Sequence, residues 1–192
     1  LAPAYQLLDS ALVDRWTEYV RGGGHLVLSC RSGQKDRNGA LWQELPSAPI
    51  YELCGIKGLF YDLLPQHYYG TIALDGKEYK WNNWADVLTP CRGTEVWASY
   101  SDQFYAGKAA VTFVAADSDD GALEEAVLRR LYAEAGVEVE NLPYGVIKEW
   151  RDGFYIALNY SSQTQYLDIP SDAEVLFGGA EIAPAGVTVW KR

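Results

Sequence analysis

The feature that most constrains this 192-residue chain is a helix pattern between two short extended segments near its start. Asp9 or Ser10 can cap the helix, because a side-chain oxygen there accepts a hydrogen bond from an otherwise unpaired amide, and the glycines at 22–24 are typical of a helix end. The apolar residues of its predicted buried face are Leu12, Val13, Trp16, Tyr19 and Val20. Since residues 1–4 and 25–30 have the composition of strands, we expect a βαβ unit and hence a parallel sheet.

The chain from residue 32 to residue 140 mixes strand and helix patterns. A hairpin is predicted around Asp75-Gly76, because both residues tolerate the positive φ angles of a tight turn. Strands are expected at 94–102 and 107–117, and a helix at 119–136. The predicted buried stripe of that helix is Leu123, Val127, Leu128 and Leu131. These elements complete an α/β layer with hairpin excursions.

The pattern changes after Gly136. Apolar and polar residues alternate from residue 145 onward, and Asp152-Gly153 joins two such runs, which predicts a second hairpin. We therefore expect two domains, residues 1–140 and 141–192, the second a small antiparallel β-domain. At about 50 residues it is too small to be very stable alone, so we expect it to lean on the rest of the protein.

Composition argues against several functional classes. A formal net charge of −10 and a pI of about 4.6 disfavour nucleic-acid binding, and no apolar run is long enough to span a membrane. Cys30, Cys54 and Cys91 lack paired spacing, which indicates reduced thiols and a cytoplasmic protein. With two histidines and no metal-binding motif, we expect neither a metal nor a cofactor. The chain has no methionine and begins at what reads as a strand end, so we expect it to be a piece of a larger protein.

The stretch LSCRSGQKDRNG, residues 28–39, holds the first candidate site. Cys30 follows a strand, as the nucleophile of an amidotransferase-like elbow does, but the glycine before it is absent and the one after it comes a residue late, at Gly33. A base is also missing, because His67 is distant in sequence and His25, five residues back on the same strand, is expected to point to the opposite face. A buried thiol is the favoured interpretation. The polar residues after it are Arg31, Lys35, Asp36 and Arg37. They fit an anion site or, preferably, an exposed turn with an interface role.

The second candidate site is aromatic. Trp81 and Trp84 lie in the segment YKWNNWADVL, where they can stack on a sugar face or pack against a neighbouring element, two interpretations of similar weight. Adjacent acids elsewhere have structural explanations: Glu124 and Glu125 lie in the first turn of a helix, and Asp152 lies in a hairpin turn. We therefore predict no catalytic residue in this chain.

Five segments, in order, resemble glycoside hydrolase family 42 β-galactosidases. They begin with the stretch APAYQLLDSALVDRW and continue with YDLLP, WADVLTP, SYSDQFYAGKAAVT and GVIKEWRDGFYIALNYSS. The resemblance covers nearly the whole chain and corresponds to the C-terminal half of the family. It implies an N-terminally incomplete, flavodoxin-like (amidotransferase-related) α/β trimerisation domain over residues 1–140 and the family's C-terminal β-domain over 141–192.

The resemblance also implies where catalysis takes place. The family cleaves terminal non-reducing β-D-galactosides with retention, using two glutamates of an N-terminal barrel that this chain does not contain. The expected role is a non-catalytic oligomerisation and accessory portion, with the barrel of the same polypeptide and two further copies in a homotrimer as partners. In such an assembly we expect Arg31, Lys35, Asp36 and Arg37 to make inter-domain or inter-subunit contacts. The alternatives are a carbohydrate-binding module that uses Trp81 and Trp84 and, less favoured, an amidotransferase-like enzyme that uses Cys30.

Overall fold

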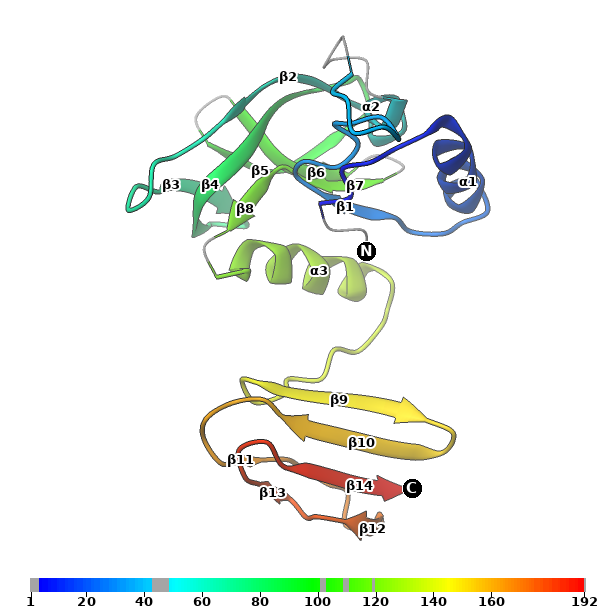
Figure 1. Ribbon diagram of the computed structural model, residues 1–192, viewed down its shortest axis with the longest axis vertical. Coiled ribbons are helices and arrows are strands. Elements are labelled where there is room, and N and C mark those ends of the chain that lie inside the picture. The colour runs from blue at the N-terminus through cyan, green and yellow to red at the C-terminus, as the bar shows by residue number, and fades with distance from the viewer. Residues whose placement is uncertain (1–3, 43–48, 101–102, 109–110, 119, 192) are drawn as a thin grey trace. The chain divides into compact units, whose positions relative to one another are not determined.

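The structure is a computed structural model that describes residues 4–42, 49–100, 103–108, 111–118 and 120–191 (Figure 1). The chain divides into two compact units, Leu1–Ala135 and Gly136–Arg192, and each is described here by itself. Within the described residues, no helix is both long enough and apolar enough to cross a membrane.

The helices are α1 (Ser10–Arg21), α2 (Pro49–Cys54) and α3 (Ala122–Glu134). The first confirms the predicted helix: Asp9 caps it by accepting a hydrogen bond from the Leu12 amide at 2.8 Å, and Gly22 ends it. The predicted buried face was wrong at Tyr19, which is 54% exposed, because its ring lies over Gly24 at the helix end instead of entering the core. Most of the strand predicted at residues 1–4 lies outside the described residues, and Ala4 itself is in a turn.

The first unit contains an eight-stranded sheet. Its strands are β1 (Val27–Ser29), β2 (Ile56–Asp62), β3 (Gly70–Leu74), β4 (Lys77–Pro90), β5 (Glu95–Tyr100), β6 (Gln103–Lys108), β7 (Thr112–Val114) and β8 (Ala116–Ser118). The strand order is β1-β7-β6-β5-β3-β4-β2, with β8 also paired to β4. Among the described pairings between named strands of this sheet only β1 and β7 are parallel, and outside these strands a single parallel bridge joins Leu7 to Lys35. The unit is therefore mainly β, with more antiparallel sheet than the predicted α/β layer, since hairpins supply most of its strands.

The β1–β7 pair nevertheless has helices on both faces (Figure 1). Val27 and Val114 belong to the core cluster completed by Leu123 and Val127 of α3. The residues that alternate with them, Leu26, Leu28, Phe113 and Ala115, belong to a second cluster that includes α1 and α2. This alternation follows from the two-residue period of a strand, and it makes the parallel pair the centre of a local three-layer arrangement.

Helix α3 has the buried stripe that its sequence predicts. Leu123, Val127 and Leu131 are buried and Leu128 is half-buried against the same cluster. Glu124 turns back to accept hydrogen bonds from the backbone amide and the hydroxyl of Ser118, which fixes the entry of the chain into the helix. Its carboxylate thus has a structural role.

Strand β4 is divided between two partners. Its first half pairs with β3 across the Asp75-Gly76 turn, whose φ angles of 50° and 78° confirm the predicted hairpin. Its second half pairs with β2, starting at Ala85. The register against β8 shifts between Trp81 and Ala85, so residues 82–84 form an irregularity at the point where β4 changes partners.

The second unit is built on a four-stranded antiparallel sheet in the order β12-β14-β10-β9. Its strands are β9 (Val146–Arg151), β10 (Phe154–Asn159), β11 (Gln165–Tyr166), β12 (Glu174–Phe177), β13 (Glu181–Ile182) and β14 (Val187–Lys191), of which β11 and β13 form a separate pair. Asp152 and Gly153 join β9 to β10 with φ angles of 52° and 91°, which confirms the second predicted hairpin. The small antiparallel β-fold predicted after the linker is therefore present.

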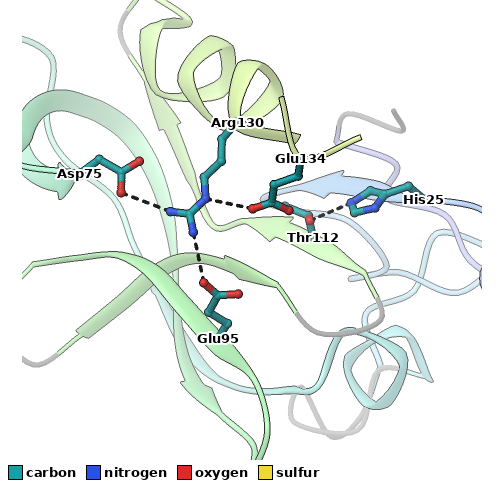
Figure 2. A network of polar contacts seen from close by, with 6 residues as sticks. All are labelled: His25, Asp75, Glu95, Thr112, Arg130 and Glu134. Atoms are coloured by element: carbon teal, nitrogen blue, oxygen red, sulfur yellow. Dashed lines mark hydrogen bonds and ion pairs between the residues drawn. The ribbon is translucent and has the colours of Figure 1, made fainter. Parts of the chain in front are cut away.

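Arg130 of α3 ties the helix to the hairpins of the first unit (Figure 2). Its guanidinium nitrogens lie 3.2 Å from Asp75, 3.1 Å from Glu95 and 3.3 Å from Glu134. The guanidinium carbon lies 4.0 Å from the ring centroid of Trp97, which is buried. One planar cation thus serves three carboxylates and an aromatic face, a combination that lysine cannot reproduce.

Replacing Arg130 with alanine is expected to lower the free energy of unfolding by about 1–2 kcal/mol, mostly through the lost stacking and the lost packing of its aliphatic stem. The ion pairs contribute less because their carboxylates are largely exposed to solvent. Arg130→Lys should recover less than half of the loss, and the loss should persist in high salt. Urea denaturation checks this; a lysine variant as stable as the wild type would contradict it.

Candidate contact surface around Arg31

A sharp turn follows strand β1, and two of its residues have left-handed backbone conformations. Arg31 has a φ of 66°, a left-handed conformation that non-glycine residues rarely adopt, and Gly33 has a φ of 71°. A Cβ atom on Gly33 would lie 2.7 Å from Ile50, so this position requires glycine on two grounds. The strained residue of the turn is therefore Arg31 itself, and such strain persists only where surrounding contacts enforce it.

The contact that enforces it comes from Asp86 of β4. One carboxylate oxygen accepts a hydrogen bond from the Arg31 backbone amide at 2.9 Å. The other accepts from the Gln34 amide at 3.0 Å and from the Trp84 indole at 2.7 Å. Asp86 is only 3% exposed, so three donors satisfy a carboxylate that has almost no access to water. This residue holds the turn after β1 against the middle of β4.

Burial raises the pKa of the Asp86 carboxyl group above its ordinary value, whereas the hydrogen bonds from Trp84, Arg31 and Gln34 act in the opposite direction. Asp86 is not among the site residues predicted from the sequence. The available signal was an acid inside the apolar run WADVL, because a charge within a buried strand is tolerated only with partners.

The Arg31 side chain lies over an aromatic pair. Its guanidinium carbon is 4.4 Å from the Trp84 ring centroid. Trp84 also stacks on Tyr61 of β2, with ring centroids 4.2 Å apart and an angle of 16° between the planes. Tyr61 is 45% exposed, so the stack begins in the Asp86 cluster and ends at the protein surface. We call Arg31, Trp84 and Tyr61 the Arg31 stack.

The other polar residues of the predicted loop have separate positions. Lys35 holds the loop to the segment before α1, since its backbone pairs with Gln6 and Leu8. Asp36 caps its own turn by accepting hydrogen bonds from the backbone amides of residues 38 and 40. The side chain of Arg37 is 83% exposed and lies 3.6 Å from Asp9, the cap of α1. The structure thus places the four residues on one loop but gives them different roles.

Cys30 is a poor nucleophile in this structure. It is 4% exposed, and burial, reinforced by the nearby Asp86 charge, raises the pKa of its thiol well above the ordinary value. The left-handed residue that a nucleophile elbow would present is Arg31, one position later. His25 contacts the Thr112 hydroxyl at 3.1 Å (Figure 2). These observations favour the packing role of Cys30 that the sequence analysis preferred.

The two tryptophans of the aromatic candidate lie in different environments. Trp81 is 4% exposed and packs in the core, where its indole lies against the backbone of Gly70. Trp84 is half-buried, and Tyr61 and Arg31 already contact its ring. In this arrangement they do not form a shared platform for a sugar. Within the described residues, no group of three or more histidine, cysteine, aspartate or glutamate side chains could hold a metal ion.

Comparison with known protein families shows to which family this chain belongs. Residues 1–139 match the family described as the β-galactosidase trimerisation domain, and residues 136–192 match the one described as the β-galactosidase C-terminal domain. This chain belongs to glycoside hydrolase family 42. It corresponds to the trimerisation and C-terminal domains of that family, as the sequence resemblance indicated.

Relatives that are named β-galactosidases agree with this assignment. The chain is 31% identical to β-galactosidase BgaH of Haloferax lucentense over 194 aligned residues, which cover 95% of the chain and 29% of the relative. A solved structure of the Halorubrum lacusprofundi β-galactosidase superposes with a TM-score of 0.83 at 26% identity, covering 100% of this chain and 30% of that one. The enzyme from Marinomonas ef1 superposes with the same TM-score at 23% identity, with coverages of 99% and 28%, which shows the shared fold. This 192-residue chain thus spans about a third or less of the length of these relatives.

Proposed function

We propose that this chain is the non-catalytic oligomerisation and accessory portion of a retaining β-galactosidase. The match of residues 1–139 to a trimerisation domain carries this proposal. The relatives bear the name β-galactosidase and are about three times longer, which leaves room for a catalytic barrel that supplies the two carboxylates of the reaction. In the proposed enzyme, hydrolysis of terminal β-D-galactosides takes place in that barrel, in the cytoplasm.

The fold of the first unit supports a flavodoxin-like trimerisation domain over residues 1–140. Helices pack on both faces of the parallel β1–β7 pair, as in a doubly wound sheet. In the described residues β1 pairs with β7 alone, so its other edge is free to accept a further parallel strand from a preceding segment. Residues 141–192 then form the β-domain that follows it.

The Arg31 stack supports a role in contacts between subunits. Arginine and aromatic residues are enriched where protein interfaces gain most of their binding energy. Here an arginine is held in a strained conformation by a buried carboxylate and placed on a surface aromatic pair. We propose that Arg31, together with Lys35, Asp36 and Arg37 of the same loop, contacts the barrel or a second copy in a homotrimer.

Turnover of a chromogenic β-galactoside tests whether catalysis takes place outside this chain. The 192-residue chain should show no turnover above buffer, whereas the full-length protein that contains it should turn the substrate over and sediment as a trimer. Hydrolysis by the purified chain would contradict the proposal, and loss of that hydrolysis in Cys30→Ala would assign it to the Cys30 thiol. A full-length protein that is inactive on β-galactosides would contradict it as well.

A further inference from the structure

A polar surface cavity of about 400 Å³, open to solvent and lined in part by the exposed residues Gln66, His67 and Asn83, lies in the first unit, where strand β4 changes partners. It is lined by Leu64, Pro65, Gln66, His67, Asn82 and Asn83. The first four residues belong to the connection between β2 and β3, and the last two belong to the irregular part of β4. Because β2 and β3 pair with the two halves of β4, their connection passes beside the irregularity. The cavity is therefore a product of the sheet topology.

Both sides of the cavity contain a residue in a left-handed conformation. His67 has a φ of 81° and occupies the third position of a turn closed by the hydrogen bond from the Tyr68 amide to the Pro65 carbonyl. Asn83 has a φ of 69° at the β4 irregularity. Glycine would adopt either conformation at lower cost, yet both positions carry polar side chains that line one cavity. The turn and the strand irregularity account for these conformations, which histidine and asparagine adopt more readily than most residues, and they fix the two polar side chains on opposite sides of the cavity.

The side chains that line the cavity indicate which kind of ligand it can bind. Side-chain amides and an imidazole donate and accept hydrogen bonds, and the lining contains no lysine, arginine, aspartate or glutamate. A ligand with many hydroxyl groups has the matching mixture of donors and acceptors, whereas an anion or a metal ion lacks a charged partner here. The connection also continues into Tyr68, whose exposed ring provides an apolar surface beside the polar one, whereas Lys80 lies over the ring of Tyr69, with its Nζ 4.2 Å from the ring centroid.

We propose that this cavity binds a neutral saccharide. Gln66, His67, Asn82 and Asn83 hydrogen-bond its hydroxyl groups, and the exposed tyrosine Tyr68 packs beside it. The site is distinct from the aromatic pair considered in the sequence analysis, since Trp81 is buried and Trp84 is part of the Arg31 stack. It goes beyond the proposed oligomerisation role and does not depend on it.

The test is saturation-transfer NMR of the 192-residue chain with lactose at concentrations on the order of 10 mM, the range of weak sugar binding. Lactose should receive saturation from the wild-type chain. His67→Gly and Asn83→Gly should each weaken binding about tenfold, through lost hydrogen bonds, while the thermal midpoint stays unchanged or rises. Glycine keeps the backbone conformation, so these variants remove only the side chain and the strain.

Asp152→Gly is the matched control, because Asp152 is also left-handed, at a φ of 52°, but lies in the hairpin of the other unit. It should leave lactose binding unchanged, and sodium sulfate should not compete. The proposal is overturned if lactose receives no saturation, if sulfate displaces it, or if both glycine variants bind as the wild type does. A change of sedimentation mass in those variants, without lactose binding to the wild type, would assign the cavity to a protein contact instead.

Discussion

Asp86→Ala is expected to lower the free energy of unfolding by about 3–5 kcal/mol. The substitution leaves three donors without their acceptor: the Arg31 backbone amide, the Gln34 side chain and the Trp84 indole. Each unpaired buried donor costs about 1–3 kcal/mol, and the three donors surround a carboxylate that is 3% exposed. Urea denaturation measures the loss. The matched exposed change Asp168→Ala should stay within about 0.5 kcal/mol of the wild type; a similarly small effect at Asp86 would contradict the account of the turn.

The pH dependence of the same site separates charge from hydrogen bonding. Because burial raises the pKa of Asp86, the folded state binds more protons than the unfolded state between the ordinary carboxyl pKa and the raised value. In that window the contribution of Asp86 to stability falls as pH rises. Asp86→Asn cannot ionise, so the difference in unfolding free energy between wild type and Asp86→Asn should move in favour of the wild type as pH is lowered through the window.

Local signals in the sequence predicted the elements that depend on neighbouring residues. The Asp75-Gly76 and Asp152-Gly153 turns and the apolar stripe of α3 all formed as expected, because turn geometry and helical spacing are set within a few residues. The exception was Tyr19, whose spacing is helical but whose ring covers the glycine turn at the end of α1. Helical spacing predicts which residues lie on the same face of a helix. It does not show which residue of that face lies at the edge of the core and stays exposed.

The Arg31 stack could be predicted only in part. The loop was identified from its charge, but its partner Asp86 lies 55 positions later, on a strand whose register shifts between Trp81 and Ala85. An alternating pattern does not reveal such a shift, and a shift of one residue exchanges the buried and exposed faces of a strand. For the same reason the sequence could not show that Trp81 is buried while Trp84 reaches the surface.

The fold class was the hardest part to predict because one βαβ pattern suggested more parallel sheet than exists. The β1–β7 pair is parallel, but the strands from β2 to β6 form antiparallel hairpins that outnumber it. The strands of a hairpin show the same alternation of apolar and polar residues whether the hairpin extends an existing sheet or packs over it. The pairing of β4 with β3 follows from the local turn, whereas its pairing with β2, β6 and β8 arises from tertiary packing.

Arg31→Gly has the second large expected effect, on assembly instead of folding. Glycine relieves the left-handed strain at a φ of 66° but loses the stacking on Trp84, and because the two effects oppose each other the free energy of unfolding should change by less than about 1 kcal/mol. Removing the guanidinium from the Trp84 ring should weaken association between subunits by about 10- to 100-fold, the effect of truncating an interface arginine. Arg31→Lys should recover little, because an ammonium group neither stacks in plane nor forms paired hydrogen bonds.

Two controls bracket this expectation. Tyr61→Ser removes the exposed end of the stack and should weaken association in the same direction. Arg92→Gly removes an exposed arginine in a turn outside the Arg31 stack and should leave association unchanged. If Arg31→Gly and Arg92→Gly have the same effect, the stack has no special part in assembly.

Sedimentation equilibrium of the full-length protein that contains this chain, wild type and Arg31→Gly, tests the central claim most directly. The account predicts a trimer for the wild type and a dissociation constant raised about 10-fold or more for Arg31→Gly, with the folded state intact by circular dichroism. A wild type that is monomeric, or a variant that assembles as tightly as the wild type, would contradict the account.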